Sequence, residues 1–106
     1  MRHLELTEIA LADLKSIRRY SERTWGSDRT AEYMAALRDT MKGLLAGTVV
    51  SRNRNDLRPG LQMATSGRHR VFFEVDQSRI LVVRVLHDRM DYQGHLDAET
   101  GLDRDR

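Results

Sequence analysis

The sequence contains no cysteine, and only two of its 18 basic residues, Lys15 and Lys42, are lysines. Without cysteine the chain can form no disulfide, hold no metal through thiolates and offer no cysteine nucleophile, which is compatible with a cytosolic protein. No apolar run is long enough to span a bilayer, and the start, M-R-H-L-E-L-T-E, lacks the apolar segment of a signal peptide. We therefore expect a cytoplasmic protein without membrane association.

The sequence also lacks a glycine-rich phosphate loop, a serine nucleophile elbow and a carboxylate dyad. These absences leave no reason in the sequence to expect a cofactor. What remains is a chain of 106 residues, of which 40% are hydrophobic and 32% are charged. That composition is typical of a single globular domain.

Charge is unevenly distributed, although the net charge is only +2. Residues 51–70 carry five arginines against one acid, whereas residues 91–106 carry five acids against two arginines. The guanidinium group presents a rigid fork of donors that suits carboxylates and phosphates, so the basic stretch indicates an acidic partner. Aromatic residues are not interleaved with these arginines, and the strand pattern places Phe72 and Phe73 in the core. The pattern favours an acidic protein surface over direct nucleic-acid binding.

Periodicity predicts two helices after a short strand. Residues 2–7 alternate polar and apolar side chains, as in a half-buried strand, and residues 8–24 repeat apolar positions at helical spacing as far as Tyr20. A second helix is predicted from an N-cap at Asp28 to a stop at Gly47, because glycine commonly ends helices. The connection is short, so the two helices should pack as a hairpin. The predicted apolar face of the second helix comprises Met34, Leu37, Met41, Leu44 and Leu45.

The second half of the sequence predicts a basic loop over 48–60 and strands over 61–65, 68–76 and 80–87. A short helix is predicted over 90–96. The expected fold is α+β, with element order β-α-α-β-β-β and a short C-terminal helix. A small antiparallel sheet should be covered by the helical hairpin. We assign residues 1–96 to one domain and 97–106 to a polar tail.

Several segments resemble the RelE/ParE superfamily of type II toxins, and the ParE branch most closely. The similar segments are A-x-x-D-L-x-x-I from Ala10, W-G at Trp25, R-P-G-L from Arg58, G-R-H-R-V-F-F from Gly67 and R-V-L-H-D-R-M-D from Arg84. Their order and spacing carry the similarity over about residues 6–96. The resemblance implies a helical hairpin across an antiparallel sheet, a ParD-like antitoxin that forms a hetero-oligomer with the toxin, and DNA gyrase as the target.

The resemblance also leaves a second activity open, because RelE-like relatives cleave messenger RNA on the ribosome. Such a nuclease needs a proton-transfer group and cations around the scissile phosphate. The candidates are His87 as acid or base, a clamp of arginines, and Tyr92 as a stacking or proton-donating group. The arginines of that clamp are Arg70, Arg84 and Arg89. Arg84 has a structural alternative as the partner of an Asp or Glu, and a third possibility is an inactive member that serves as an antitoxin-bound regulatory partner.

A metal site is the last alternative. His87, Asp91 and His95 follow one another at intervals of four, but His87 closes a predicted strand, so a polar helix face is the better interpretation.

The leading hypothesis is a binding surface rather than a site of turnover. We predict that partners contact Trp25 at the hairpin tip together with five arginines: Arg52, Arg58, Arg68, Arg70 and Arg89. An antitoxin segment should bind as an amphipathic helix in a groove and continue as an extended stretch near a sheet edge. Its acids should meet one or more of Arg52, Arg58, Arg68 and Arg70.

Overall fold

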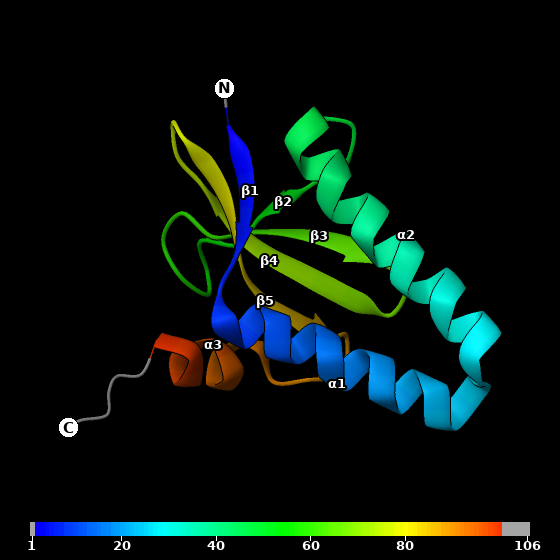
Figure 1. Cartoon of the computed structure of the whole chain (residues 1–106). Helices are drawn as coiled ribbons and strands as arrows, with labels where there is room; N and C mark the ends of the chain where they lie inside the picture. Colours follow the sequence, from blue (N-terminus) through cyan, green and yellow to red (C-terminus); the bar gives the residue numbers. More distant parts are fainter. Residues whose placement is uncertain (1, 101–106) are drawn as a thin grey trace.

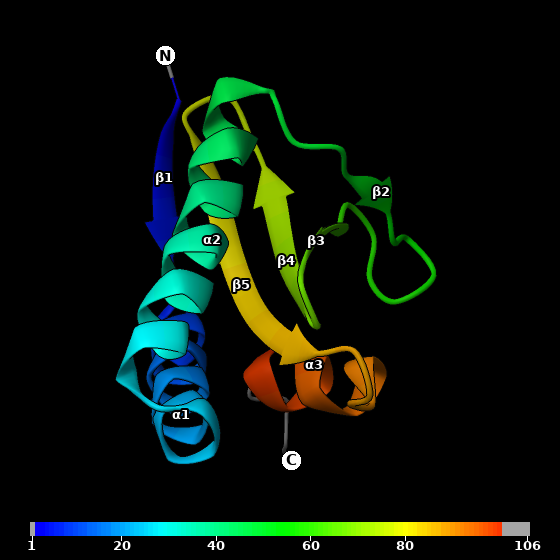
Figure 2. The ribbon, with the colours of Figure 1, turned by 90° about the vertical axis from the view of Figure 1, so that its right-hand side faces the viewer.

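The computed structural model describes residues 2–100, with side chains described through Asp97. A helical hairpin lies against one face of a twisted sheet, and a short helix and a loop lie against the other (Figures 1 and 2). The sheet has the strand order β1-β5-β4-β3-β2. The elements are β1 (His3–Leu6), α1 (Glu8–Trp25), α2 (Ser27–Ala46), β2 (Arg52–Asn53), β3 (Gln62–Ser66), β4 (His69–Val75), β5 (Arg79–His87) and α3 (Tyr92–Thr100).

The α+β class and the helical hairpin are confirmed, but the sheet is mixed rather than antiparallel. β1 runs parallel to β5, with His3 opposite Arg79 and Leu6 opposite Val82. Parallel neighbours need a long crossover, and here the hairpin and the β3–β5 meander supply it. Alternation of side chains does not encode strand direction, so the pattern over residues 2–7 could not reveal this pairing. β2 was also missed, because two residues are too few to show a period.

The sheet is covered on both faces. Val71 and Phe73 face the hairpin core, where Leu37 is fully buried, whereas Phe72 faces a second core with Leu96 of α3. The helical stripes extend beyond the area that the sheet covers. Tyr20 and Leu45, which the spacing placed on the apolar faces of the two helices, are therefore 59% and 43% exposed.

One residue joins the two helices. Gly26 has φ +86° and donates its N–H to the Glu22 carbonyl, and α2 begins at Ser27 rather than behind an Asp28 cap. Glycine reaches this backbone region without the steric cost that a Cβ adds. The predicted stop at Gly47 is confirmed, with φ +78° and an N–H bonded to the carbonyls of Gly43 and Leu44. The predicted C-terminal helix starts later than expected and continues to Thr100, while residues 101–106 of the predicted tail lie outside the described residues.

Helix α1 is anchored to the edge of β5 that β1 leaves uncovered. The β1–β5 pairing stops at Val82, and a bulge follows in β5, because Phe72 pairs with Arg84 while the next residue, Phe73, pairs with Val82. Beyond Val82, Thr7 contacts the edge of β5 in place of β1. Its hydroxyl donates to the Val83 carbonyl (2.9 Å) and accepts the Ala10 N–H (3.0 Å), so the N-terminus of α1 is capped and tied to the sheet at once.

Further along α1, Asp13 is bonded to two residues of β5. Its carboxylate accepts two bonds of 2.8 Å from the Arg84 guanidinium and a third, of 2.9 Å, from the Val85 N–H. Arg84 also donates to the His95 carbonyl at 2.8 Å. The two charged side chains are 14% and 11% exposed, so this pair joins α1, β5 and α3 in a largely dry environment. Arg84 is a structural arginine.

Replacing Asp13 with asparagine tests this anchor. Asparagine keeps the size and one carbonyl acceptor, but it leaves the Arg84 charge buried without its partner. We expect Asp13→Asn to lower the free energy of unfolding by about 3 kcal/mol, in the range for breaking a buried ion pair. Asp39→Asn, at an exposed position of α2, is the matched control and should stay within about 0.5 kcal/mol of wild type in the same urea titrations. Equal stability of the two variants would contradict the anchoring role.

Candidate functional site

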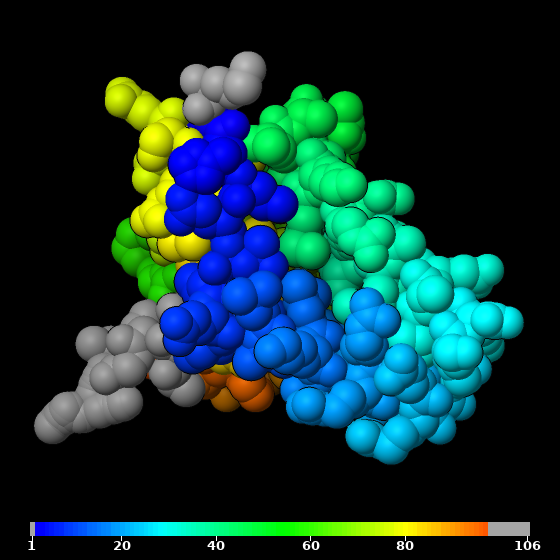
Figure 3. All heavy atoms as spheres, in the orientation of Figure 1, coloured from blue at the N-terminus to red at the C-terminus, as the bar shows by residue number. Residues whose placement is uncertain are grey.

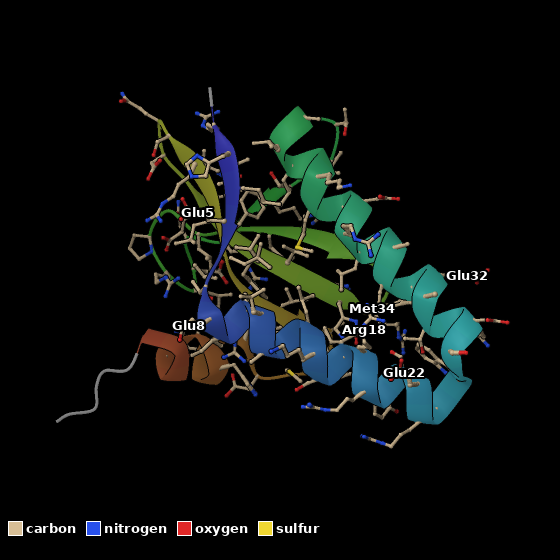
Figure 4. All side chains as sticks on the ribbon, in the orientation of Figure 1. Glu5, Glu8, Arg18, Glu22, Glu32 and Met34 are labelled. Atoms are coloured by element: carbon tan, nitrogen blue, oxygen red, sulfur yellow. The ribbon has the colours of Figure 1, made fainter. Side chains whose placement is uncertain are left out.

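Two hollows lie on different faces of α1. The first, which we call the interhelical groove, has a volume of about 300 Å³ and lies between α1 and α2. In Figure 4, Arg18 and Met34 lie in the angle between the two helices, and Figure 3 shows the atoms of α1 and α2 that flank this face. Its floor is apolar and its rim carries three cations, Lys15, Arg18 and Arg38. The apolar lining consists of Leu11, Leu14, Met34, Leu37 and Met41.

The second hollow, which we call the tip pocket, has a volume of about 410 Å³. It lies between the tip of the helical hairpin, the β3–β4 turn and the end of β5. It is lined by side chains from segments that lie far apart in the sequence, including aromatic residues and two histidines. Its lining consists of Ser16, Ile17, Tyr20, Ser21, Trp25, Tyr33, Arg68, His69, His87 and Met90.

A row of rings forms one wall of the tip pocket. Trp25 and Tyr33 have ring centroids 5.8 Å apart, Tyr33 and His69 are 5.5 Å apart, and His69 and His87 meet edge to face at 5.3 Å. Tilted and edge-to-face arrangements at these separations are favourable for aromatic pairs. The wall therefore links α1, α2, β4 and β5.

Hydrogen bonds hold Tyr33 at the centre of this wall. Its hydroxyl accepts the Arg68 N–H at 3.1 Å, is hydrogen-bonded to His69 Nδ1 at 2.6 Å and lies 3.3 Å from the Ser66 carbonyl. Gly67 must be glycine here. It has φ +57°, and a Cβ at this position would lie 2.8 Å from the Tyr33 ring. The β3–β4 turn is thus shaped around the tyrosine.

Burial sets the protonation of this wall. It lowers the pKa of His69 to about 4, and the nearby positive charge of protonated His87 acts in the same direction, while Asp88 opposes it. Burial also raises the pKa of the Tyr33 phenol. The His69 imidazole and the Tyr33 phenol are therefore neutral at physiological pH.

Two residues of the alternative nuclease site, Arg84 and Tyr92, lie apart from His87. Arg84 is held by Asp13, and Tyr92 packs on Phe72, with ring centroids 5.0 Å apart, in the core on the opposite face of the sheet. The Arg70 guanidinium donates to the carbonyls of Gly67 and His69 and lies 3.9 Å from Asp88 Oδ2.

His87 alone of this set lines the tip pocket. Its Nδ1 accepts the Arg89 N–H at 3.1 Å and lies 3.0 Å from Asp88 Oδ1.

The predicted partner-binding residues separate into two groups. Arg68 and Trp25 line the tip pocket, and exposed Arg89 lies two residues after His87, outside the lining itself. Arg52 lies on β2 at the opposite edge of the sheet, and Arg58 pairs with Glu74 at 3.0 Å. The residues that sequence reasoning missed are Tyr20, Tyr33 and Met90 at the tip pocket, and the three cations of the interhelical groove.

His95 Nδ1 lies 2.9 Å from the carbonyl of Asp91, the residue before α3, and among the side chains described through Asp97 no three His, Asp or Glu residues are grouped to hold a metal. Within the described part of the chain, none of the helices combines the length and apolar character that a membrane crossing requires.

The lowered pKa of His69 makes stability depend on pH in a defined window. Because the folded value of about 4 lies below the ordinary value of 6.5, the unfolded chain binds the proton more readily between these limits. The contribution of the neutral His69 ring to the free energy of unfolding is fully present above pH 6.5 and is lost as the pH falls towards 4. After allowance for partial exposure of the ring, the loss should be about 1–2 kcal/mol.

Urea titrations between pH 4 and 7.5 check this expectation. His69→Gln should reduce the slope of the free energy of unfolding against pH. NMR titration of the ring should give a midpoint near pH 4; a midpoint near 6.5 would contradict the assignment.

Comparison with known proteins places the chain in a family. The family model described as the ParE toxin of the type II toxin-antitoxin system parDE matches residues 4–92. The chain is 34% identical over 96 residues to Toxin ParE1 of Caulobacter vibrioides, covering 91% of this chain and 99% of that protein. It is 38% identical over 92 residues to Toxin ParE of Escherichia coli, covering 86% and 89%.

A solved structure titled "Chromosomal ParDE TA system from P. aeruginosa" has the same fold, with a TM-score of 0.69 at 22% identity, covering 82% of this chain and 96% of that chain. The resemblance seen in the sequence is confirmed, and the chain belongs to the ParE family of type II toxins.

Proposed function

We propose that this ParE-family toxin inhibits DNA gyrase by binding and that a ParD-like antitoxin neutralises it in a hetero-oligomer in the cytoplasm. The observation that carries the proposal is the family match over residues 4–92, which spans every residue that lines the two hollows. The separation of Arg84 and Tyr92 from His87 supports binding rather than turnover. A phosphate clamp needs cations that converge on one point, and Arg84 is committed to Asp13 instead.

The interhelical groove suits the amphipathic helix of the antitoxin. An apolar floor flanked by Lys15, Arg18 and Arg38 matches a helix with an apolar face and acidic borders. The extended part of the antitoxin would follow along β2, the edge strand, where Arg52 is exposed. Arg58 and Arg70, which make the internal contacts described above, are secondary contacts in this arrangement. Arg68, Arg89 and Trp25 are left on the side of the tip pocket.

Reversing one charge on the groove tests the antitoxin site. Arg38→Glu should weaken binding of the antitoxin encoded beside the toxin gene by about tenfold or more at low salt, because close charge pairs across an interface contribute on this scale. The matched control is Arg2→Glu, an equal charge change at an exposed position outside the groove. Calorimetric titration at 50 mM and 300 mM salt provides the measurement. Equal affinity of both variants at low salt would remove the groove from the antitoxin interface.

The gyrase proposal is tested by two readouts on purified toxin. Wild type should block supercoiling by gyrase and leave ribosome-bound message intact. His87→Gln keeps a similar size and one hydrogen-bonding function, so inhibition should weaken by no more than about the 1 kcal/mol of one hydrogen bond.

A nuclease that uses His87 for proton transfer would instead lose about 10²–10⁴-fold in cleavage rate. Message cut by wild type but not by His87→Gln, with normal supercoiling, would establish the RelE-like activity. No effect in either assay would indicate an inactive, regulatory member.

A further inference from the structure

Exposed apolar side chains gather around the tip pocket. Eight large hydrophobic residues are exposed in the described part of the chain, and three of them, Tyr20, Trp25 and Met90, line this one hollow. They come from the middle of α1, the end of α1 and the turn after β5. Apolar side chains that surround a concavity mark interaction sites, and aromatic residues are enriched among those that dominate binding energy.

The aromatic wall of the tip pocket is already ordered. Tyr33 is fixed by the Arg68 N–H and by His69, and the shape of the turn at Gly67 follows the ring. Little conformational freedom is therefore lost when the pocket is filled, which favours affinity. A volume of about 410 Å³ accommodates one large side chain together with the backbone around it.

The polar groups at the rim select the neighbours of that side chain. His87 accepts the Arg89 N–H on Nδ1, so in the neutral ring Nε2 carries the proton and can donate to an incoming oxygen. Arg68 is 60% exposed, with its Nε 3.8 Å from Asp88, and Arg29 lies over the Trp25 ring, 5.4 Å from its centroid. These donors suit one or two carboxylates beside the apolar anchor.

The same electrostatics disfavour a nucleic acid. A phosphate backbone requires several cations along its path. Here Arg70 is turned onto the carbonyls of Gly67 and His69, and His69 stays neutral. The carboxylate of Asp88 lies close to His87, and its buried Oδ1 accepts no hydrogen bond from the residues that the structure describes. A short acidic protein segment fits this balance better than a polyanion.

We propose that the tip pocket is the docking site for the target protein, into which an acidic segment of the target inserts one large apolar side chain. This assignment rests on the proposed function, in which the target is held by binding. The interhelical groove, which we assign to the antitoxin, lies on a different face of α1. Leu14 and Arg18 line the groove, whereas Ile17 and Tyr20 line the pocket. The two partners therefore use separate linings of one helix.

Trp25 is the only tryptophan of the chain, so its fluorescence reports on the pocket directly. The probes are three capped pentapeptides, Asp-Glu-Phe-Asp-Glu, the same peptide with Ala for Phe, and Lys-Lys-Phe-Lys-Lys, together with a ten-nucleotide oligothymidine. The acidic Phe peptide should shift the Trp25 emission saturably, and the other two peptides should bind at least tenfold more weakly. A saturable shift with the oligothymidine and none with the acidic Phe peptide would overturn the proposal in favour of a nucleic-acid site.

Two surface variants connect the pocket to the target. Tyr20→Ala and Arg68→Glu should each weaken both peptide binding and inhibition of supercoiling by purified gyrase at least tenfold. The matched controls are Leu45→Ala and Arg2→Glu, at exposed positions outside the pocket, and they should leave both readouts unchanged. Antitoxin affinity and melting temperature of all four variants show that each one is folded.

The outcomes separate this inference from the proposed function. If wild type inhibits gyrase and Tyr20→Ala and Arg68→Glu inhibit equally well, the pocket does not bind the target. If the acidic Phe peptide binds as expected and wild type leaves supercoiling untouched, the chemistry of the pocket stands and gyrase as the target fails.

Discussion

The ion pair between Asp13 and Arg84 positions the helix that lines both hollows. β1 covers only the first part of the β5 edge, and the carboxylate of Asp13 satisfies both the Val85 N–H and the guanidinium beyond it. This contact fixes the position of α1 against the sheet, and through the His95 carbonyl it fixes α3 as well. Because α1 forms one wall of the interhelical groove and one wall of the tip pocket, both hollows depend on this single pair.

One helix thus serves two surfaces of different character. The groove side of α1 combines leucines with cations, which suits a long amphipathic partner. The pocket side presents Ile17 and Tyr20 towards a wall of rings, which suits a single inserted side chain. The residues that line the groove and those that line the pocket do not overlap.

Periodicity predicted the parts of the fold that depend on local pattern. The two helices and the Gly47 stop follow from spacing and from glycine's tolerance of positive φ. Spacing shows which face of a helix is apolar, but it does not show how far the sheet extends beneath it, so it could not reveal that Tyr20 is exposed. The direction of β1 and the bulge in β5 depend on long-range pairing.

The tip pocket was invisible in the sequence for the same reason. Its aromatic wall is assembled from Trp25, Tyr33 and the turn at Gly67, which are separated by many residues and show no common motif. The basic stretch seemed to lack aromatic neighbours only because these rings come from the hairpin. Arg84 shows the opposite case, since its cationic character was evident but its buried partner could be found only from the fold.

The parallel pairing of β1 with β5 also has a consequence for biosynthesis. His3 pairs with Arg79, and Asp13 bonds to Arg84 across 71 residues of sequence. Contacts of such long range form only after both segments have left the ribosome, so the helical hairpin emerges early but cannot be positioned until the last strand follows. A nascent or truncated toxin therefore has neither a finished groove nor a finished pocket. Both hollows are completed late in folding, when β5 pairs with β1 and Arg84 reaches Asp13.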